Sequence, residues 1–337
     1  MKRVLNCRFL ILIFISVFVF ESCSSDDSDI VSNDSQAVDN NNDNNNDNDN
    51  DQDQNGGDQN GGQQSQEIEG SITLYRVEGN NIVKERDFNV TGKLKELQDD
   101  VAKHRALWEF TKNIAPESYI RKLSQFMIFA GENNGTAGYV FNTENDLSKW
   151  QMGLAIDFAY SGGSLNSDGE FAYTVIHEFG HIVTLDNTQV DGNIGNEACP
   201  NYFIQEGCTK LPSYINVMYQ RHWSDIASEH AAIGDDQGKA QQFYDKHSDR
   251  FVTQYAATNP PEDIAEVFTR FVLDANRPGG TTVADQKVQL LYDYNELLQI
   301  RDHIRRNQQQ TGRALKIKRW DIARANKKSK MGCLRHR

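Results

Sequence analysis

The feature that most constrains this chain is the run at residues 171–185, FAYTVIHEFGHIVTL, in which apolar side chains recur at helical spacing. No proline interrupts the run. Gly180 lowers its helix propensity, so we expect another backbone to approach closely at that position. The run therefore predicts a helix with one wide apolar face, around which the rest of the domain is organised.

This predicted helix contains His177, Glu178 and His181. Side chains four residues apart lie on the same face of a helix. The two histidines can therefore place imidazole nitrogens on one metal ion, with Glu178 beside them to accept a proton from water. The alternative is two core histidines and a solvated glutamate. In a chain with eight histidines, however, an HExxH pentad arises by chance roughly once in a hundred sequences.

The N-terminus has the pattern of an exported lipoprotein. Basic residues at positions 2 and 3 precede an apolar run at 9–20, which is shorter than the ~20 residues needed to span a bilayer. We therefore expect residues 1–22 to be a signal peptide. Ser22-Cys23 resembles a lipobox, in which Cys23 is acylated and becomes the first residue of the mature protein. Ordinary cleavage, with Cys23 incidental, is the alternative, because Glu21 is an unusual neighbour.

Residues 23–66 are expected to form a disordered acidic tether. Positions 24–66 contain eleven Asp and no aromatic residue, Lys or Arg, so this segment cannot bury enough apolar area to offset its ordering entropy. The sequence SSDD at 24–27 resembles the acidic signal that directs lipoproteins of Bacteroidetes-type bacteria to the outer face of the outer membrane. Alternatively, the acidic linker simply begins there. The resemblance implies a cell-surface protein facing the exterior, held to the membrane only by its lipid.

The formal charge of −13 is unevenly distributed. The body, residues 67–300, has a net charge of −15, whereas residues 301–337 hold thirteen Lys or Arg against two Asp. Positive charge confined to one end argues against a nucleic-acid binder. We expect residues 316–337 to form a solvated basic tail.

Three cysteines remain after the signal peptide and Cys23. In an oxidising compartment Cys199 and Cys208, which flank a short loop, are the natural disulfide pair, and Cys333 is left over. No C-x-x-C spacing supports a second metal site.

Residues 67–315 are long enough for one large domain, or for a domain with a small subdomain. Strand patterns precede the metal-site helix and helical patterns follow it, which predicts an α+β fold of two layers with a small, mostly antiparallel sheet. The expected strands are 71–77 and 81–84, which form a hairpin, and then 125–130, 138–141 and 151–158. The expected helices, besides 171–185, are 94–114, 213–230, 239–255, 261–275 and 288–305.

A catalytic zinc usually takes a third protein ligand and a water. The position six residues beyond His181 is Asn187, which excludes a third histidine there. Later histidines follow no spacing rule: His222, His230 and His247. Glu262 and Glu266 lie on the predicted helix 261–275, with Tyr255 seven residues before Glu262. Glu262 and Tyr255 also have ordinary explanations. A carboxylate is favoured in the first turn of a helix, and a tyrosine can extend an apolar face.

The combination of HEFGH with a later Y-x6-E-x3-E resembles the lethal-factor-like gluzincin zinc metallopeptidases and the zinc-binding metallopeptidase lipoproteins of Bacteroidetes. The motifs cover residues 170–275. The resemblance implies a zincin-like domain in which zinc is held by His177, His181 and Glu262. It also implies that Glu178 is the general base and that Tyr255 stabilises the oxyanion.

Spacing alone does not say which of Glu262 and Glu266 binds the metal. The resemblance gives the ligand role to Glu262. Glu266 is then expected to accept the ring N–H of a ligand histidine, His177 or His181, and to fix its orientation.

These residues predict a surface-anchored zinc metallopeptidase acting on a peptide or protein substrate, which could extend a sheet edge at residues 153–158. The rival hypothesis is a surface lipoprotein that keeps its zinc but binds proteins or glycans without cutting them. Glu178 and Tyr255 argue against that rival, because binding zinc requires neither. A purely structural zinc is disfavoured because no fourth Cys or His ligand is apparent.

Overall fold

The computed structural model describes residues 67–133, 135–161, 163–167, 169–310 and 332–333. All of them belong to the compact unit Asn60–Arg337. The expected signal peptide, Cys23, the acidic tether and nearly all of the basic tail lie outside the described residues. Within the described part of the chain, no helix combines the length and apolarity that crossing a membrane requires.

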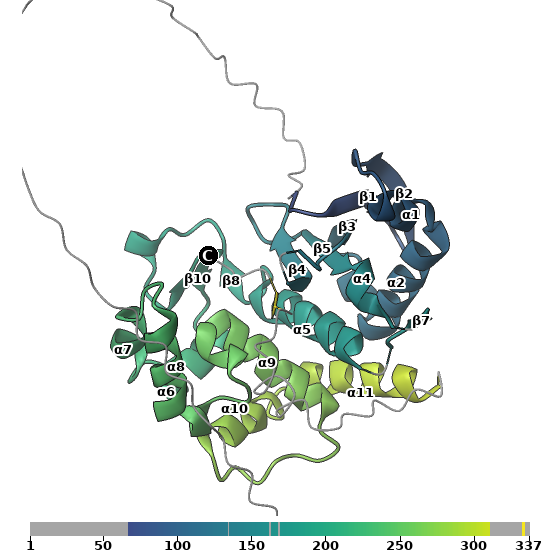
Figure 1. The fold of residues 1–337 in the computed structure, drawn as a ribbon. Coiled ribbons are helices and arrows are strands. Elements are labelled where there is room, and N and C mark those ends of the chain that lie inside the picture. Colours follow the sequence, from purple (N-terminus) through teal and green to yellow (C-terminus); the bar gives the residue numbers. More distant parts are fainter. Residues whose placement is uncertain (1–66, 134, 162, 168, 311–331, 334–337) are drawn as a thin grey trace, which may run out of the picture. The chain divides into compact units, whose positions relative to one another are not determined.

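A mixed β-sheet forms one side of the domain (Figure 1). Its strands follow the order β11-β4-β5-β3-β1-β2. Three neighbouring pairs are antiparallel, and the pairs β3–β5 and β4–β11 are parallel. The strands are β1 (Ser71–Glu78), β2 (Asn81–Asp87), β3 (Leu123–Phe129), β4 (Thr136–Asn142), β5 (Trp150–Ala155) and β11 (Gly332–Cys333).

The central strand β3 is stabilised because its side chains alternate between two apolar clusters. Phe126 and Ile128 of β3 face the larger cluster, which the helices share, while Met127 and Phe129 face a smaller cluster on the opposite side of the sheet. Every residue of β3 is buried as a result. This sheet supports the helix that carries the HEFGH motif.

The HEFGH helix α5 (Glu170–Leu185) packs along β4. The expected helix 94–114 is in fact two helices. They are separated by Asp100, whose side chain caps the second helix by accepting the N–H of Lys103. The other elements before α5 are α1 (Lys93–Asp99), α2 (Val101–Ile114), α3 (Glu117–Ile120), α4 (Ile156–Ala159), β6 (Tyr160–Ser161) and β7 (Ser164–Leu165).

The half of the domain after α5 is mainly helical, and α9 (Pro260–Leu273) packs directly against α5 (Figure 1). The domain is therefore α+β, as predicted. The long predicted helices are shorter here, with breaks at Trp223, after Lys246 and near Tyr292. The helices are α6 (Tyr214–His222), α7 (Ala227–Ala231), α8 (Gln237–Lys246), α10 (Val283–Leu291) and α11 (Asn295–Gln310). The short 3₁₀ helices are η1 (Asn196–Ala198), η2 (Ser248–Arg250) and η3 (Tyr255–Thr258).

The prediction that residues 153–158 form a sheet edge is wrong. β5 ends at Ala155, and the chain continues directly into α4. β5 also lies between β4 and β3, so both of its edges are already paired. The strand beside α5 is instead β4, whose outer edge pairs with the two residues of β11.

A small three-stranded sheet follows α5 and contains the Cys199–Cys208 disulfide, the pair expected from the sequence. Cys208 lies on its central strand, so the bridge ties this sheet to the preceding loop. The strands are β8 (Val190–Asp191), β9 (Phe203–Ile204) and β10 (Gly207–Thr209).

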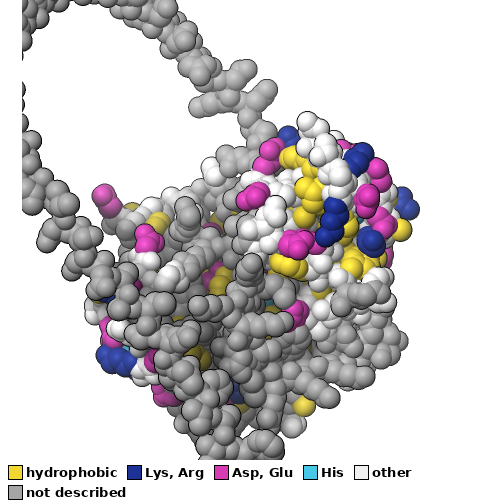
Figure 2. All heavy atoms as spheres, viewed as in Figure 1, with side chains coloured by type: hydrophobic (Ala, Val, Ile, Leu, Met, Phe, Trp, Pro, Cys, Tyr) yellow, Lys and Arg dark blue, Asp and Glu magenta, His cyan; other side chains and the backbone are white. Residues whose placement is uncertain are grey.

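The surface over β1, β2 and α1 carries basic and acidic side chains intermixed (Figure 2). They form exposed ion pairs: Arg86 with Glu67, Lys84 with Asp87, and Lys95 with Asp99. Pairs of this kind contribute little to stability.

Candidate metal centre

Close packing of α5 against α9 brings the two halves of the candidate metal centre together. A Cβ atom at Gly180 would lie 2.9 Å from Cδ1 of Phe268 and 3.5 Å from the backbone of Ala265. Gly180 therefore permits the close backbone approach expected from the sequence. The histidines of α5 consequently face the first turns of α9.

The start of α9 is set by local signals in the sequence. The Asn259 side chain accepts the N–H of Glu262 at 2.8 Å, and prolines occupy the first two helical positions. This cap places Glu262 in the first turn, where the helix dipole favours a carboxylate. Glu262 is completely buried, so its charge has to be compensated inside the protein.

Three side-chain atoms converge between α5 and α9. Nε2 of His177 and Nε2 of His181 lie 3.1 Å apart. Oε2 of Glu262 lies 3.1 Å from the first of these nitrogens and 3.4 Å from the second. All three side chains are buried, and together they form a group that could hold a metal ion. His177, His181 and Glu262 are thus brought together although they come from distant parts of the chain.

The donor set and its spacing fit a tetrahedrally bound ion. Zinc binds histidine nitrogen at about 2.0–2.1 Å, so two such nitrogens on one ion lie about 3.3 Å apart. The observed nitrogen separation of 3.1 Å is close to this value. Oε1 of Glu262 is buried and accepts no hydrogen bond from the described residues. The group therefore offers a cation two imidazole nitrogens and a carboxylate. These are donor types found in metal sites.

The electrostatics of Glu262 point the same way. Burial acts to raise the pKa of its carboxyl group, but the imidazoles of His181 and His177 outweigh burial and hold that pKa well below its usual range. Glu262 is thus ionised in this environment. An anionic oxygen beside two imidazole nitrogens is the ligand set expected from the sequence.

Glu178 follows His177 on α5, and its side chain is completely buried. A Cβ atom at Gly138 of β4 would lie 3.0 Å from Cγ of Glu178 and 2.8 Å from Cγ2 of Thr174. Only glycine allows β4 to approach this closely. Glu178 is therefore held at the contact between the metal-site helix and the sheet.

Tyr255 begins η3 and lies beside the ring of His177. The centre of its ring is 5.9 Å from the centre of the His177 ring. The expected helix 239–255 ends earlier, so Tyr255 is presented by a 3₁₀ turn just before α9. The tyrosine thus lies beside the candidate metal centre.

Glu266 lies one turn after Glu262 and faces the other ring nitrogen of His177. Its Oε1 is 2.8 Å from His177 Nδ1, which resolves the choice that the spacing had left open between the two histidines. An acceptor at Nδ1 favours the tautomer in which Nε2 keeps its lone pair for a metal. Glu266 is placed to orient the His177 ring.

Two residues missed by the sequence reasoning hold Glu266 in turn. Oε2 of Glu266 accepts the hydroxyl of Tyr173 and the hydroxyl of Thr253, each at 2.5 Å. Tyr173 precedes His177 by four residues on α5, so its position on the same helix face was a readable signal. Thr253 lies in an irregular segment and had no such signal.

Three later histidines have other partners or positions: His222, His230 and His247. Nε2 of His230 lies 2.9 Å from the carbonyl oxygen of Thr258, and His247 lies beside Glu229. Burial and nearby cations lower the pKa of His222 to about 4. None of these three belongs to the group that could hold a metal.

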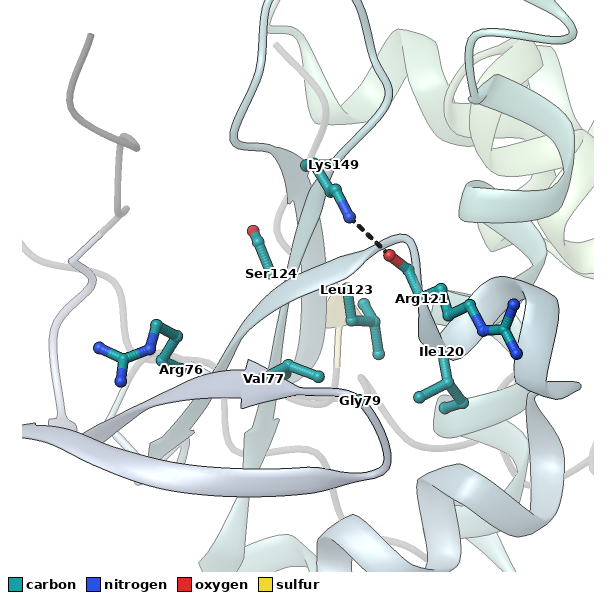
Figure 3. A pocket seen from close by; sticks show the side chains of 8 residues that line it. All are labelled: Arg76, Val77, Gly79, Ile120, Arg121, Leu123, Ser124 and Lys149. Atoms are coloured by element: carbon teal, nitrogen blue, oxygen red, sulfur yellow. Dashed lines mark hydrogen bonds between the residues drawn. The ribbon is translucent and has the colours of Figure 1, made fainter.

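A cavity of about 410 Å³ opens elsewhere, on the side of β1 and β3 (Figure 3). Three basic residues line it, but they do not converge. Arg76 pairs with Glu78, Arg121 pairs with Glu117, and Lys149 donates to the backbone oxygen of Arg121. Figure 3 shows the Arg76 and Arg121 side chains on opposite sides of the cavity. This arrangement provides no focused anion site.

Comparison with protein-family models, with curated proteins and with solved structures found no match for this chain. The functional assignment therefore depends on the geometry of the candidate metal centre.

Proposed function

We propose that this protein is a zinc-dependent metallopeptidase of the gluzincin type. The observation that carries the proposal is the convergence of two imidazole nitrogens and the Glu262 carboxylate, with the buried Glu178 next to His177 on α5. His177, His181 and Glu262 would hold the zinc. A zinc ion in such a site lowers the pKa of water and polarises a carbonyl group.

The chain's own residues supply the proton transfers and the orientation. Glu178 takes a proton from the attacking water and delivers it to the leaving amine. Tyr255 donates a hydrogen bond to the oxygen that gains negative charge, a contribution of about 3 kcal/mol in comparable sites. Glu266 keeps the His177 ring in the orientation that binds metal.

We propose that an extended peptide substrate lies along β4. Gly138 of β4 is packed against Glu178, so a peptide on this strand lies near the general base. The outer edge of β4 already pairs with another backbone, because Gly332 and Cys333 lie parallel to it opposite Thr136 and Gly138. A substrate at Gly138 would therefore take the place of β11. Main-chain pairing of this kind is a common way to bind extended peptides.

The test of the peptidase proposal is a peptide-library digestion by the mature full-length protein with zinc. Glu178→Gln should lower the cleavage rate about 10²- to 10⁴-fold, the usual contribution of a general base, while zinc content stays the same. Glu170→Gln, at the partly exposed start of the same helix, is the matched control and should cleave like the wild type. An equal rate in Glu178→Gln would sink the mechanism. Retained zinc without any cleavage would favour the protein- or glycan-binding alternative.

We also propose a location at the outer face of the outer membrane. The support is the sequence of the N-terminus: a short apolar run, Ser22-Cys23 and an acidic segment. Mass spectrometry of the mature N-terminus should find lipid on Cys23. An unmodified Cys23 would remove the anchor from the proposal and leave the metal site untouched.

A further inference from the structure

Thr253 lies between η2 and η3, and its hydroxyl contacts two parts of the site at once. Oγ1 donates a hydrogen bond to Oε2 of Glu266 at 2.5 Å. The same oxygen accepts the backbone N–H of Ala256 at 3.1 Å. A hydroxyl has one hydrogen to donate and lone pairs to accept, so both bonds form together. One side chain therefore joins the His177-orienting carboxylate to the turn that carries Tyr255.

On one side, Thr253 helps to fix Glu266. The two carboxylate oxygens of Glu266 have different tasks. Oε1 faces Nδ1 of His177, and Oε2 accepts the hydroxyls of Thr253 and Tyr173. Glu266 is completely buried, where hydrogen bonds to a charged acceptor are strong. Losing one of these donors frees the carboxylate to rotate and loosens the His177 ring.

On the other side, Thr253 helps to fix the turn. η3 begins at Tyr255, and the residue before it, Gln254, makes no side-chain capping bond. A Thr hydroxyl that accepts an N–H three residues ahead stabilises such a turn locally. Ala256 is the residue next to Tyr255, so this bond holds the backbone from which the Tyr255 ring extends toward His177.

We propose that Thr253 is a positioning residue that couples the orientation of His177 to the placement of Tyr255. The inference rests on the proposed function, in which both residues act on one substrate. Thr253 itself touches neither the metal ligands nor the substrate in this assignment. Its role is to hold the proposed ligand His177 and the proposed oxyanion donor Tyr255 in fixed positions relative to each other.

The test uses the mature full-length protein with Thr253→Val, which removes the hydroxyl at nearly constant volume, and Thr253→Ser, which keeps it. Thr269→Val is the control for losing a buried hydroxyl on α9, because Thr269 donates only to the backbone oxygen of Ala265 among the bonds described. Thr253→Val should lower kcat with KM little changed, by no more than the about 10- to 100-fold that loss of a direct partner of a metal ligand costs. Thr253→Ser and Thr269→Val should stay near the wild-type value.

A double-variant cycle separates coupling from general damage. If Thr253 acts through Tyr255, adding Thr253→Val to Tyr255→Phe should cost less than it costs alone. Full additivity of the two losses, or a Thr253→Ser protein as impaired as Thr253→Val, would overturn the proposal.

Two measurements do not depend on peptidase activity. In the metal-free protein, Thr253→Val should speed hydrogen exchange of the Ala256 amide, and zinc titration should show a weaker affinity by up to about 10-fold. Faster exchange with unchanged zinc affinity would reduce Thr253 to a local turn former and reject the coupling. Both effects without any peptide cleavage in the wild type would support the coupling and reject the peptidase proposal instead.

Discussion

Two carboxylates occupy consecutive positions on α9, and each is buried in a different polar cluster. Glu262 belongs to the candidate metal centre. Asp263 belongs to what we call the charge cluster, formed with Lys287 and Trp223. Asp263 Oδ2 lies 2.5 Å from Lys287 Nζ and accepts Trp223 Nε1 at 2.6 Å, and both charged side chains are 0% exposed. The rings of Phe251 and Trp223 lie beside the ammonium group.

The two clusters differ in where the compensating cation comes from. In the charge cluster the protein supplies it as Lys287. Burial raises the pKa of Asp263 and lowers the pKa of Lys287, while their mutual attraction opposes both shifts. In the candidate metal centre, no Lys or Arg pairs with Glu262 among the described residues, and only imidazoles face it. A buried carboxylate that faces imidazoles and no Lys or Arg could hold an external cation, which fits the candidate metal centre.

The largest effect should come from removing the metal-site carboxylate. Glu262→Ala should abolish zinc binding at micromolar protein, because a lost ligand costs more than the about 10- to 100-fold loss typical of an outer partner. Asp263→Asn is the matched control one residue away and should keep the wild-type zinc affinity. Calorimetric titration with zinc measures both. Equal losses in the two variants would mean that the clusters are not separate.

Breaking the charge cluster should damage stability rather than metal binding. Lys287→Met leaves Asp263 as an uncompensated buried charge, and we expect a loss of about 3–5 kcal/mol in the free energy of unfolding. The double variant Lys287→Met/Asp263→Leu should recover much of that loss, because it removes both charges. Urea unfolding measures the free energy of unfolding, and excess zinc keeps the candidate metal centre filled during the measurement. A zinc affinity that falls along with stability in Lys287→Met would contradict the distinction.

Metal removal should lower stability only through the candidate metal centre. With free zinc at 100 times its dissociation constant, binding stabilises the folded protein by about 2.7 kcal/mol, which a chelator removes. The same increment is expected in Lys287→Met, measured from its lower baseline. Glu262→Ala should show none. Thermal unfolding with and without chelator checks this, and a chelator effect in Glu262→Ala would point to a second metal site.

The smallest effect should come from the carboxylate that orients His177. Glu266→Ala should weaken zinc affinity by about 10- to 100-fold, since it removes the partner of Nδ1 but no ligand. Competition with a calibrated zinc chelator gives the affinity. A larger loss than in Glu262→Ala would reverse the roles assigned to the two glutamates.

Much of the candidate site could be predicted from the sequence because the patterns that indicate it are local. His177 and His181 share a helix face at four-residue spacing, and Gly180 marked a close helix contact before the partner helix was known. Element boundaries were less readable, because single caps and turns decide them. Asp100 splits one predicted helix by accepting the N–H of Lys103, and the strand of residues 151–158 stops at Ala155.

The sequence by itself determined the helix with its two histidines, the α+β order of elements and the cysteine pair, because each depends on spacing within a few residues. Only the tertiary structure decided that Glu266 faces His177, that β4 rather than β5 lies beside the metal-site helix, and that Thr253 links both sides of the site. The partners in such contacts can be far apart in the chain, as with His177 and Glu262 at 85 positions. Local periodicity carries no information about which distant side chains meet, because the packing of α5 on α9 brings them together.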